Sequence, residues 1–330
     1  MNRRKAELAL LFNVVIWGVT FVLVKRALHE ISPVLFLAMR FSLAALALVA
    51  VFGVRVRHAA GWQAKACPTK AGWQAKACPT KAGWQAKACP TKAGWQAKAR
   101  PAKMLAAGSM IGLFLFAGYL LQTVGLQSTT APKSAFLTGL ATVMVPLLGA
   151  LVYQIRPRVT EVAGVLAATL GMGLMTLEGP IGSISRGDML TFGGAIAFAA
   201  HVVATGHFAE QIGYEVLSVT QVGAAALAAL SLVWVVETPR IHWQPLVVWA
   251  ILITGLLCTA LAFTIQAWAQ HYTSSTRTAL IYALEPVVAW ITSYCIAGEG
   301  LSGQAAAGAA LILSGVLLVE MKPFEARPHL

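Results

Sequence analysis

The sequence predicts an all-α integral membrane protein whose ten transmembrane helices form two inverted five-helix repeats. Of its 330 residues, 58% are hydrophobic and 11% are charged, and the mean hydropathy is +0.71. A soluble domain carries about 25% charged residues, because its surface must stay in water. The composition therefore favours lipid as the solvent. The spacing of the apolar segments and an internal repeat then indicate the number and arrangement of the helices.

The first apolar segment follows a basic N-terminus, Arg3-Arg4-Lys5, and extends from about Leu8 to Val24. A basic start before an apolar run is also typical of a secretory signal peptide. This run is long enough to span a membrane, lacks a small-x-small cleavage motif and is closed by Lys25-Arg26. We therefore expect it to be the first transmembrane helix.

Ten segments are long and apolar enough to cross the hydrocarbon core, which takes about 20 residues in a helix. They are residues 7–26, 33–53, 104–122, 134–153, 159–178, 188–207, 216–236, 246–266, 278–297 and 303–320. Clusters of Gly, Pro and polar residues separate them, as expected of loops.

Lys and Arg are distributed unequally between the two sides of this arrangement. The loops on the side of both termini contain 19 basic residues, whereas the opposite loops contain five. Because basic residues accumulate in cytoplasmic loops, both termini are predicted to be cytoplasmic, in a multi-pass protein of the inner (plasma) membrane. The net charge of +13 comes mostly from one loop, so we expect membrane lipids rather than nucleic acid as partners.

That loop contains a tandem repeat at residues 60–103. Three units read Ala-Gly-Trp-Gln-Ala-Lys-Ala-Cys-Pro-Thr-Lys, and a fourth differs only at Arg100 and Ala102. The units lack the apolar face that stacked repeats need, and their Pro residues interrupt a helix. We expect a flexible, basic cytoplasmic loop over residues 54–103, or one whose Trp and Lys residues bind the lipid surface. The Cys spacing fits no zinc site and cytoplasmic thiols stay reduced, so no disulfide, metal or cofactor is expected.

The two halves of the chain also resemble each other. Tyr119-x-x-Gln122 and the run Lys133 to Leu137 recur 144 residues later as Phe263-x-x-Gln266 and the run Arg277 to Ile281. The offset is larger before the tandem repeat, by about the length of three surplus units. Weaker matches at this offset of 181 pair Glu7 with Asp188 and Trp17 with Phe198.

Residues 1–180 and 181–330 are therefore predicted to be related repeats with five spans each. Because five is odd, the second repeat enters the membrane from the opposite side. Inverted repeats are typical of secondary transporters, in which the halves rock around a central site and give alternating access. The alternatives are a membrane-embedded enzyme, for which the sequence shows no ordered nucleophile and base, and a membrane scaffold without transport activity.

Short motifs follow one another in a fixed order along both halves. They are Asn13-x-x-x-Trp17-Gly18-x-x-Phe21-x-x-x-Lys25, Pro33 with Arg40-Phe41, Gly125-Leu126 to Pro146, Gly187-Asp188, Leu284-Glu285-Pro286 and Gly298-Glu299-x-Leu301. In this order they resemble the EamA family of the drug/metabolite transporter (DMT) superfamily, over the whole chain except residues 60–103. The resemblance implies two five-helix EamA repeats, no ATPase domain and transport of small metabolites, often amino acids or related compounds. We expect a secondary transporter that works as an exporter, and not an enzyme.

Two charged side chains are expected near the centre of the bilayer. Arg40 lies about seven residues into its span and Glu285 about eight into its own, ~10 Å and ~12 Å from opposite faces. A charge at this depth costs about 2.5–3.5 kcal/mol on insertion scales. Either Arg40 binds a substrate carboxylate and Glu285 binds an amine or a coupling proton, or the two residues form a structural ion pair.

Pro146 and Pro286 lie inside predicted spans. Each lacks an N–H, leaves the carbonyl four residues earlier without its usual partner and bends its helix. Helices interrupted in this way line many transporter cavities, although simple bending is an equally good interpretation.

Further candidates are polar or aromatic side chains inside the spans. Trp17 and Tyr282 are expected either to form an aromatic wall for the substrate or to pack. Lys133 and Arg277 are expected to anchor helix starts at the membrane surface. Uniport, exchange and proton coupling all fit the sequence. The polar candidates, expected to bond neighbouring helices or to contact the substrate, are Asn13, Gln122, His201 and Gln266.

Overall fold

The computed structural model describes residues 2–65, 101–129, 131–153, 158–176, 185–288, 291 and 303–320. These residues are helical apart from turns, short connections and an isolated antiparallel bridge between Ile31 and Ile241. The helices are α1 Asn2–Ala27, α2 Pro33–Lys65, α3 Pro101–Gly125, α4 Ala131–Gly139, α5 Ala141–Tyr153, α6 Val159–Thr176, α7 Arg186–Ala209, α8 Tyr214–Val236, α9 Pro245–Gly255, the π-helix η1 Leu256–Leu261, α10 Ala262–Ala269, α11 Ser275–Tyr282 and α13 Gly303–Glu320.

Within the described residues, seven helical segments are long and apolar enough to cross a membrane, and two further apolar helices are shorter. All nine coincide with predicted spans. The remaining predicted span, 278–297, begins in α11 and in helical residues 285–288, and most of its second half lies outside the described residues. The seven segments are Arg3–Ala27, Pro33–Val56, Ala102–Gly125, Ser134–Val152, Arg186–Ala209, Tyr214–Val236 and Pro245–Ala269, and the shorter two are Val159–Leu174 and Gly303–Leu318.

Large apolar side chains cover the outer faces of these helices. Leu46, Leu151, Leu227 and Trp234 are 69%, 75%, 70% and 77% exposed. A soluble monomer seldom presents so much continuous apolar surface to water. The exposure is the arrangement expected of helices that face lipid.

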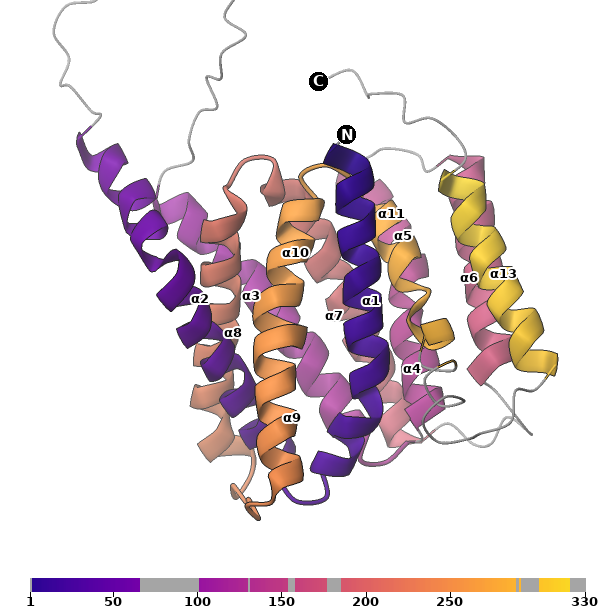
Figure 1. Ribbon diagram of the computed structural model, residues 1–330, viewed down its shortest axis with the longest axis horizontal. Coiled ribbons are helices and arrows are strands. Elements are labelled where there is room, and N and C mark those ends of the chain that lie inside the picture. Colours follow the sequence, from indigo (N-terminus) through magenta and orange to yellow (C-terminus); the bar gives the residue numbers. More distant parts are fainter. Residues whose placement is uncertain are drawn as a thin grey trace, which may run out of the picture.

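The helices form a bundle in which most neighbours run in opposite directions (Figure 1). The most extensive packing joins α6 to α13, α3 to α7 and α2 to α8, and α1 packs along α9 and α10. The start of α1, the end of α2 and the end of α13 lie at one end of the bundle (top of Figure 1). We call this the terminal end.

The pair α6 and α13 stands at one edge of the bundle and packs through glycines. A Cβ atom on Gly171 would lie 2.5 Å from the carbonyl oxygen of Gly308, and one on Gly315 would lie 2.5 Å from that of Gly164. Small residues allow such close backbone contact, which replaces the hydrophobic effect as the source of helix association in lipid.

Two predicted boundaries are wrong. The loop predicted from residue 54 begins later, because α2 continues to Lys65. The sequence before Pro68 contains no proline to stop it. The predicted helix 134–153 is divided at Leu140, between α4 and α5, and Pro146 lies inside α5 rather than at the interruption.

The second predicted kink lies beside its proline. α11 ends at Tyr282, a turn follows at Ala283 and Leu284, and Glu285 and Pro286 begin the next helical segment. Proline is well tolerated in a first helical turn, where its missing N–H would have no partner. Residues 66–100, with most of the tandem units, and 177–184, with the predicted repeat boundary, lie outside the described residues.

Candidate functional site

Arg40 extends from α2 into the bundle and is only 4% exposed. Its Nε donates a 2.7 Å hydrogen bond to Oγ1 of Thr259. Its Cζ lies 4.2 Å from the centre of the Tyr119 ring. A hydroxyl oxygen and an aromatic face both attract a guanidinium, so these contacts lower the cost of burying Arg40 without neutralising its charge.

The other end of the guanidinium has no fixed partner. No hydrogen bond from the two terminal nitrogens and no ion pair with Glu285 is found within the described residues, so the predicted structural pair of Arg40 and Glu285 is not formed there. Neither nitrogen belongs to the fully enclosed atoms that lack a partner. Both therefore border open space and can receive an anionic group.

Aromatic rings from four helical regions meet beside Arg40. The centroid of the Trp17 ring lies 4.8 Å from that of Tyr282 and 5.6 Å from that of Phe263. The Tyr119 ring lies 5.0 Å from Phe198 and 6.1 Å from Phe263. Their tilted and edge-to-face contacts are the favourable geometries for aromatic pairs. We define the central site as Trp17, Arg40, Tyr119, Phe198, Phe263, Tyr282 and Glu285.

Asn13 connects the aromatic rings to the backbone. Its Nδ2 donates a 2.8 Å hydrogen bond to the carbonyl oxygen of Ala262 and lies 3.3 Å from the hydroxyl oxygen of Tyr282. Its Oδ1 is enclosed and accepts no hydrogen bond within the described part of the chain. Asn13 thus joins α1 to α10 and α11 and keeps one acceptor unused beside Tyr282.

Glu285 is half-buried and lies close enough to Tyr119 and Tyr282 to act on both electrostatically. Its carboxyl group forms no hydrogen bond or ion pair with any described residue. An ionised carboxylate inside a membrane protein is costly unless a cation, a proton or water meets it. The central site therefore combines an unpaired carboxyl group, a guanidinium with two free nitrogens and an aromatic lining.

A sequence model of the EamA-like transporter family matches residues 4–68, 89–177 and 185–321, which is most of the chain. The chain belongs to the EamA-like transporter family. It is therefore a multi-pass membrane transporter with repeated EamA domains, and not an enzyme.

Similar proteins agree with this assignment. An uncharacterized transporter of Archaeoglobus fulgidus is 30% identical over 323 residues, covering 98% of this chain and 88% of that protein. The uncharacterized transporter YyaM of Bacillus subtilis is 27% identical over 217 residues, covering 63% and 70% of the two chains. One solved crystal structure, 19% identical, superposes with a TM-score of 0.69 over 97% of both chains and thus shares the fold.

His201 lies beside the central site of this EamA transporter. Its ring centroid is 5.4 Å from that of Phe263, and its Nε2 lies 2.9 Å from Oε1 of Gln221 on α8. Both His201 and Gln221 are buried, and Nε2 of Gln221 is enclosed without a hydrogen bond among the described residues. The bond between α7 and α8 is of the interhelical kind expected for His201.

The two other glutamines of the sequence prediction bond outside the central site. Gln122 donates a 3.0 Å hydrogen bond to Thr138 and so joins α3 to α4, as expected. Gln266 donates a 3.1 Å bond to Gln270 at the end of its own helix, which differs from the expected contact with a neighbouring helix. In this structure both side chains hold helices in place.

Arg277 differs most from its expected role. It is buried rather than at the membrane surface, and its Nη1 lies 3.5 Å from Oε1 of Glu7 on α1. Glu7 also accepts a 2.6 Å bond from Arg3. The prediction of a surface anchor is wrong for Arg277, because a partner 270 residues earlier in the chain compensates its burial. The side chain of Lys133, its counterpart in the first repeat, lies outside the described residues.

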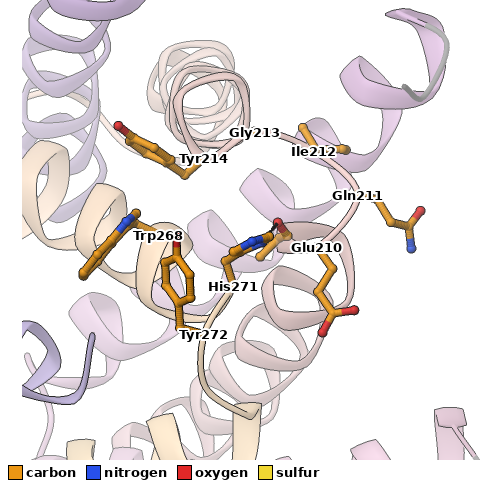
Figure 2. Close-up of a pocket in the computed structure, with 9 residues that line it drawn as sticks. Glu210, Gln211, Ile212, Gly213, Tyr214, Trp268, His271 and Tyr272 are labelled. Carbon is orange, nitrogen blue, oxygen red and sulfur yellow. Dashed lines mark hydrogen bonds between the residues drawn. The ribbon is translucent and has the colours of Figure 1, made fainter. Parts of the chain in front are cut away.

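A separate cavity of about 270 Å³ lies where the α7–α8 connection meets the end of α10 (Figure 2). Trp268, Tyr272 and Tyr214 contribute aromatic rings, and Nδ1 of His271 lies 3.1 Å from the carbonyl oxygen of Ala209. None of the predicted site residues lines it. No group of three or more metal-ligating side chains occurs among the described residues. The central site, and not this cavity, therefore gathers the charged and aromatic side chains singled out from the sequence.

Proposed function

We propose that this EamA transporter exports small metabolites, such as amino acids or related compounds, across the cytoplasmic membrane by alternating access. Two inverted five-helix repeats, residues 1–180 and 181–330, rock around the central site. Arg40 binds a carboxylate of the substrate, and Glu285 binds its amine or a coupling proton. The observation that carries the proposal is the meeting, inside the bundle, of a guanidinium with free nitrogens, an unpaired carboxyl group and an aromatic lining.

The bounds of the helices support two related repeats. α4 and α6 begin 144 residues before α11 and α13, α3 ends 144 residues before α10, and α2 begins 181 residues before α8. These are the two offsets found in the sequence. α2 and α8 lie side by side and run in opposite directions, as do α6 and α13 (Figure 1). Equivalent helices that run in opposite directions are expected of inverted repeats.

The repeats differ in chemistry at their equivalent positions. The offset of 181 pairs Arg40 with Gln221, and the offset of 144 pairs Tyr119 with Phe263. One repeat therefore supplies a cation stacked on a phenol ring, whereas the other supplies a neutral amide that bonds His201. A single guanidinium favours a substrate with one carboxylate, which it can bind through two parallel hydrogen bonds.

Polar contacts close the terminal end of the bundle and support a gating role there. Arg277 is paired with Glu7, which joins α11 to α1. Gln270 donates a 2.9 Å hydrogen bond to the carbonyl oxygen of Val202 on α7, and Ser275 donates a 3.3 Å bond to the same oxygen. Under alternating access these bonds keep the path closed on the terminal side and break when the central site opens there.

Counterflow in proteoliposomes tests the proposal. Vesicles containing the purified protein are loaded with unlabelled amino acids, amines or nucleosides and then given trace amounts of the labelled compounds. We expect accumulation of at least one compound that carries a carboxylate, and none in protein-free vesicles. Accumulation restricted to amines without a carboxylate would contradict the role of Arg40. No accumulation of any class would contradict transport of these metabolites.

A further inference from the structure

The π-helix η1 changes the hydrogen bonding of the segment that faces Arg40 and Trp17. The N–H of Ala262 donates to the carbonyl oxygens of Leu257 and Thr259. In an α-helix it would donate to Cys258, four residues earlier. The carbonyl oxygen of Cys258 instead accepts a 3.0 Å hydrogen bond from Nε1 of Trp17. The wider turn thus makes a backbone acceptor available to an aromatic ring of the central site.

Thr259 lies inside this π-helical turn and has an unusual bonding pattern. Its Oγ1 donates a 2.8 Å hydrogen bond to the carbonyl oxygen of Thr254, five residues earlier. Threonines in regular helices bond carbonyls three or four residues earlier, as Thr254 does to Ala250. Because the hydroxyl proton of Thr259 is used in this way, its lone pairs are left as acceptors for Nε of Arg40 at 2.7 Å.

We infer that Thr259, held by the π-helical turn, is the positioning residue that aims Arg40 at the substrate. Fixing Nε leaves only the two terminal nitrogens facing open space and keeps the guanidinium on the Tyr119 ring. A long side chain held at one atom loses less rotational freedom when it binds a ligand. The inference rests on the proposed function, because it takes Arg40 as the residue that binds the substrate.

Three variants separate positioning from packing. Thr259→Val keeps the branched shape and removes the hydroxyl, and Thr259→Ser keeps the hydroxyl. Thr254→Val is the matched control, because it removes a buried hydroxyl of the same segment that bonds only its own helix. Thermal unfolding of each variant in detergent reports whether the fold is kept.

The direct readout is the Nε–H signal of Arg40 in magnetic resonance spectra of the full chain, with isotope-labelled arginine, in lipid nanodiscs. The signal is assigned by its absence in Arg40→Lys. We expect its exchange with water to be slow in the wild type, in Thr259→Ser and in Thr254→Val. In Thr259→Val we expect exchange roughly tenfold faster or more, the ratio for a lost hydrogen bond of about 1.4 kcal/mol. An Arg40 signal unchanged in Thr259→Val would overturn the inference.

Counterflow of a radiolabelled mixture of L-amino acids, measured on the same variants, distinguishes this inference from the proposed function. If both hold, Thr259→Val lowers counterflow at low concentration about tenfold but adds nothing in an Arg40→Ala background. A changed Arg40 signal with undiminished counterflow in Arg40→Ala would support positioning and refute the role of Arg40 in binding. An unchanged signal with counterflow lost in Arg40→Ala would refute positioning alone.

Discussion

Replacing Arg40 by Lys separates the charge of this residue from its geometry. In the wild type, Nε bonds Thr259, the guanidinium plane lies against Tyr119 and two terminal nitrogens remain for a ligand. A lysine keeps the positive charge but has a single nitrogen, which cannot make all three contacts. If charge alone holds the substrate, Arg40→Lys should work nearly as well as the wild type.

The contacts indicate how large the loss should be. A hydrogen bond that involves a charged group contributes about 1.5–3 kcal/mol, and a cation over an aromatic ring contributes about 0.5–2 kcal/mol. An ammonium that binds the substrate gives up at least one of these contacts and the bidentate geometry as well. We therefore expect the apparent affinity in Arg40→Lys to fall by about 10- to 100-fold, which corresponds to about 1.4–2.8 kcal/mol.

The assay is the concentration dependence of counterflow in proteoliposomes. The half-saturating concentration should rise in Arg40→Lys, and transport should be lost in Arg40→Ala. Thr254→Val serves as the control for a change in the same part of the bundle that leaves Arg40 and its partners in place. A half-saturating concentration in Arg40→Lys within twofold of the wild type would refute the argument that guanidinium geometry matters.

Three other predictions follow from separate parts of the structure. Gly171→Ala forces a Cβ against α13 and should destabilise the protein by about 1–3 kcal/mol, whereas Gly223→Ala meets no atom within 4 Å; equal thermal unfolding midpoints would contradict this packing. Glu285→Gln carries a fixed neutral group, so the pH dependence of flux should disappear if coupling uses this carboxyl, and an unchanged pH profile would remove Glu285 from coupling. Glu7→Gln leaves Arg277 without its ion pair, and hydrogen–deuterium exchange at the start of α11 should rise about fivefold or more; unchanged exchange would argue against a gate at this end.

Most of the fold could be predicted because hydropathy reports the membrane directly. Nine described helices lie within a few residues of predicted spans. The division at Leu140 and the π-helix Leu256–Leu261 were missed, because both lie in continuous apolar runs that also fit a regular helix. The extension of α2 to Lys65 was missed for the opposite reason, since polar residues follow Val56 and hydropathy no longer reports the helix.

The central site could be predicted in part, since a charge or an aromatic ring inside a span needs a reason to be there. Arg40, Trp17 and Tyr282 were singled out in this way. Thr259 was not, because a threonine in a membrane helix usually bonds its own backbone and only the π-helical turn gives it another partner. The pair of Glu7 and Arg277 was also missed, because their contact depends on which helix ends meet in three dimensions.

Alternating access is tested most directly by labelling a single cysteine in the central site from each side of the membrane. Phe198→Cys, in a protein whose five native cysteines are replaced by alanine and which retains counterflow, places a thiol in the aromatic lining. We expect an impermeant maleimide to reach it both from outside, in right-side-out vesicles, and from the cytoplasmic side, in inverted vesicles, and transported substrate to slow both reactions. Labelling from only one side under every condition, or from neither, would contradict rocking of the two repeats around a shared central site.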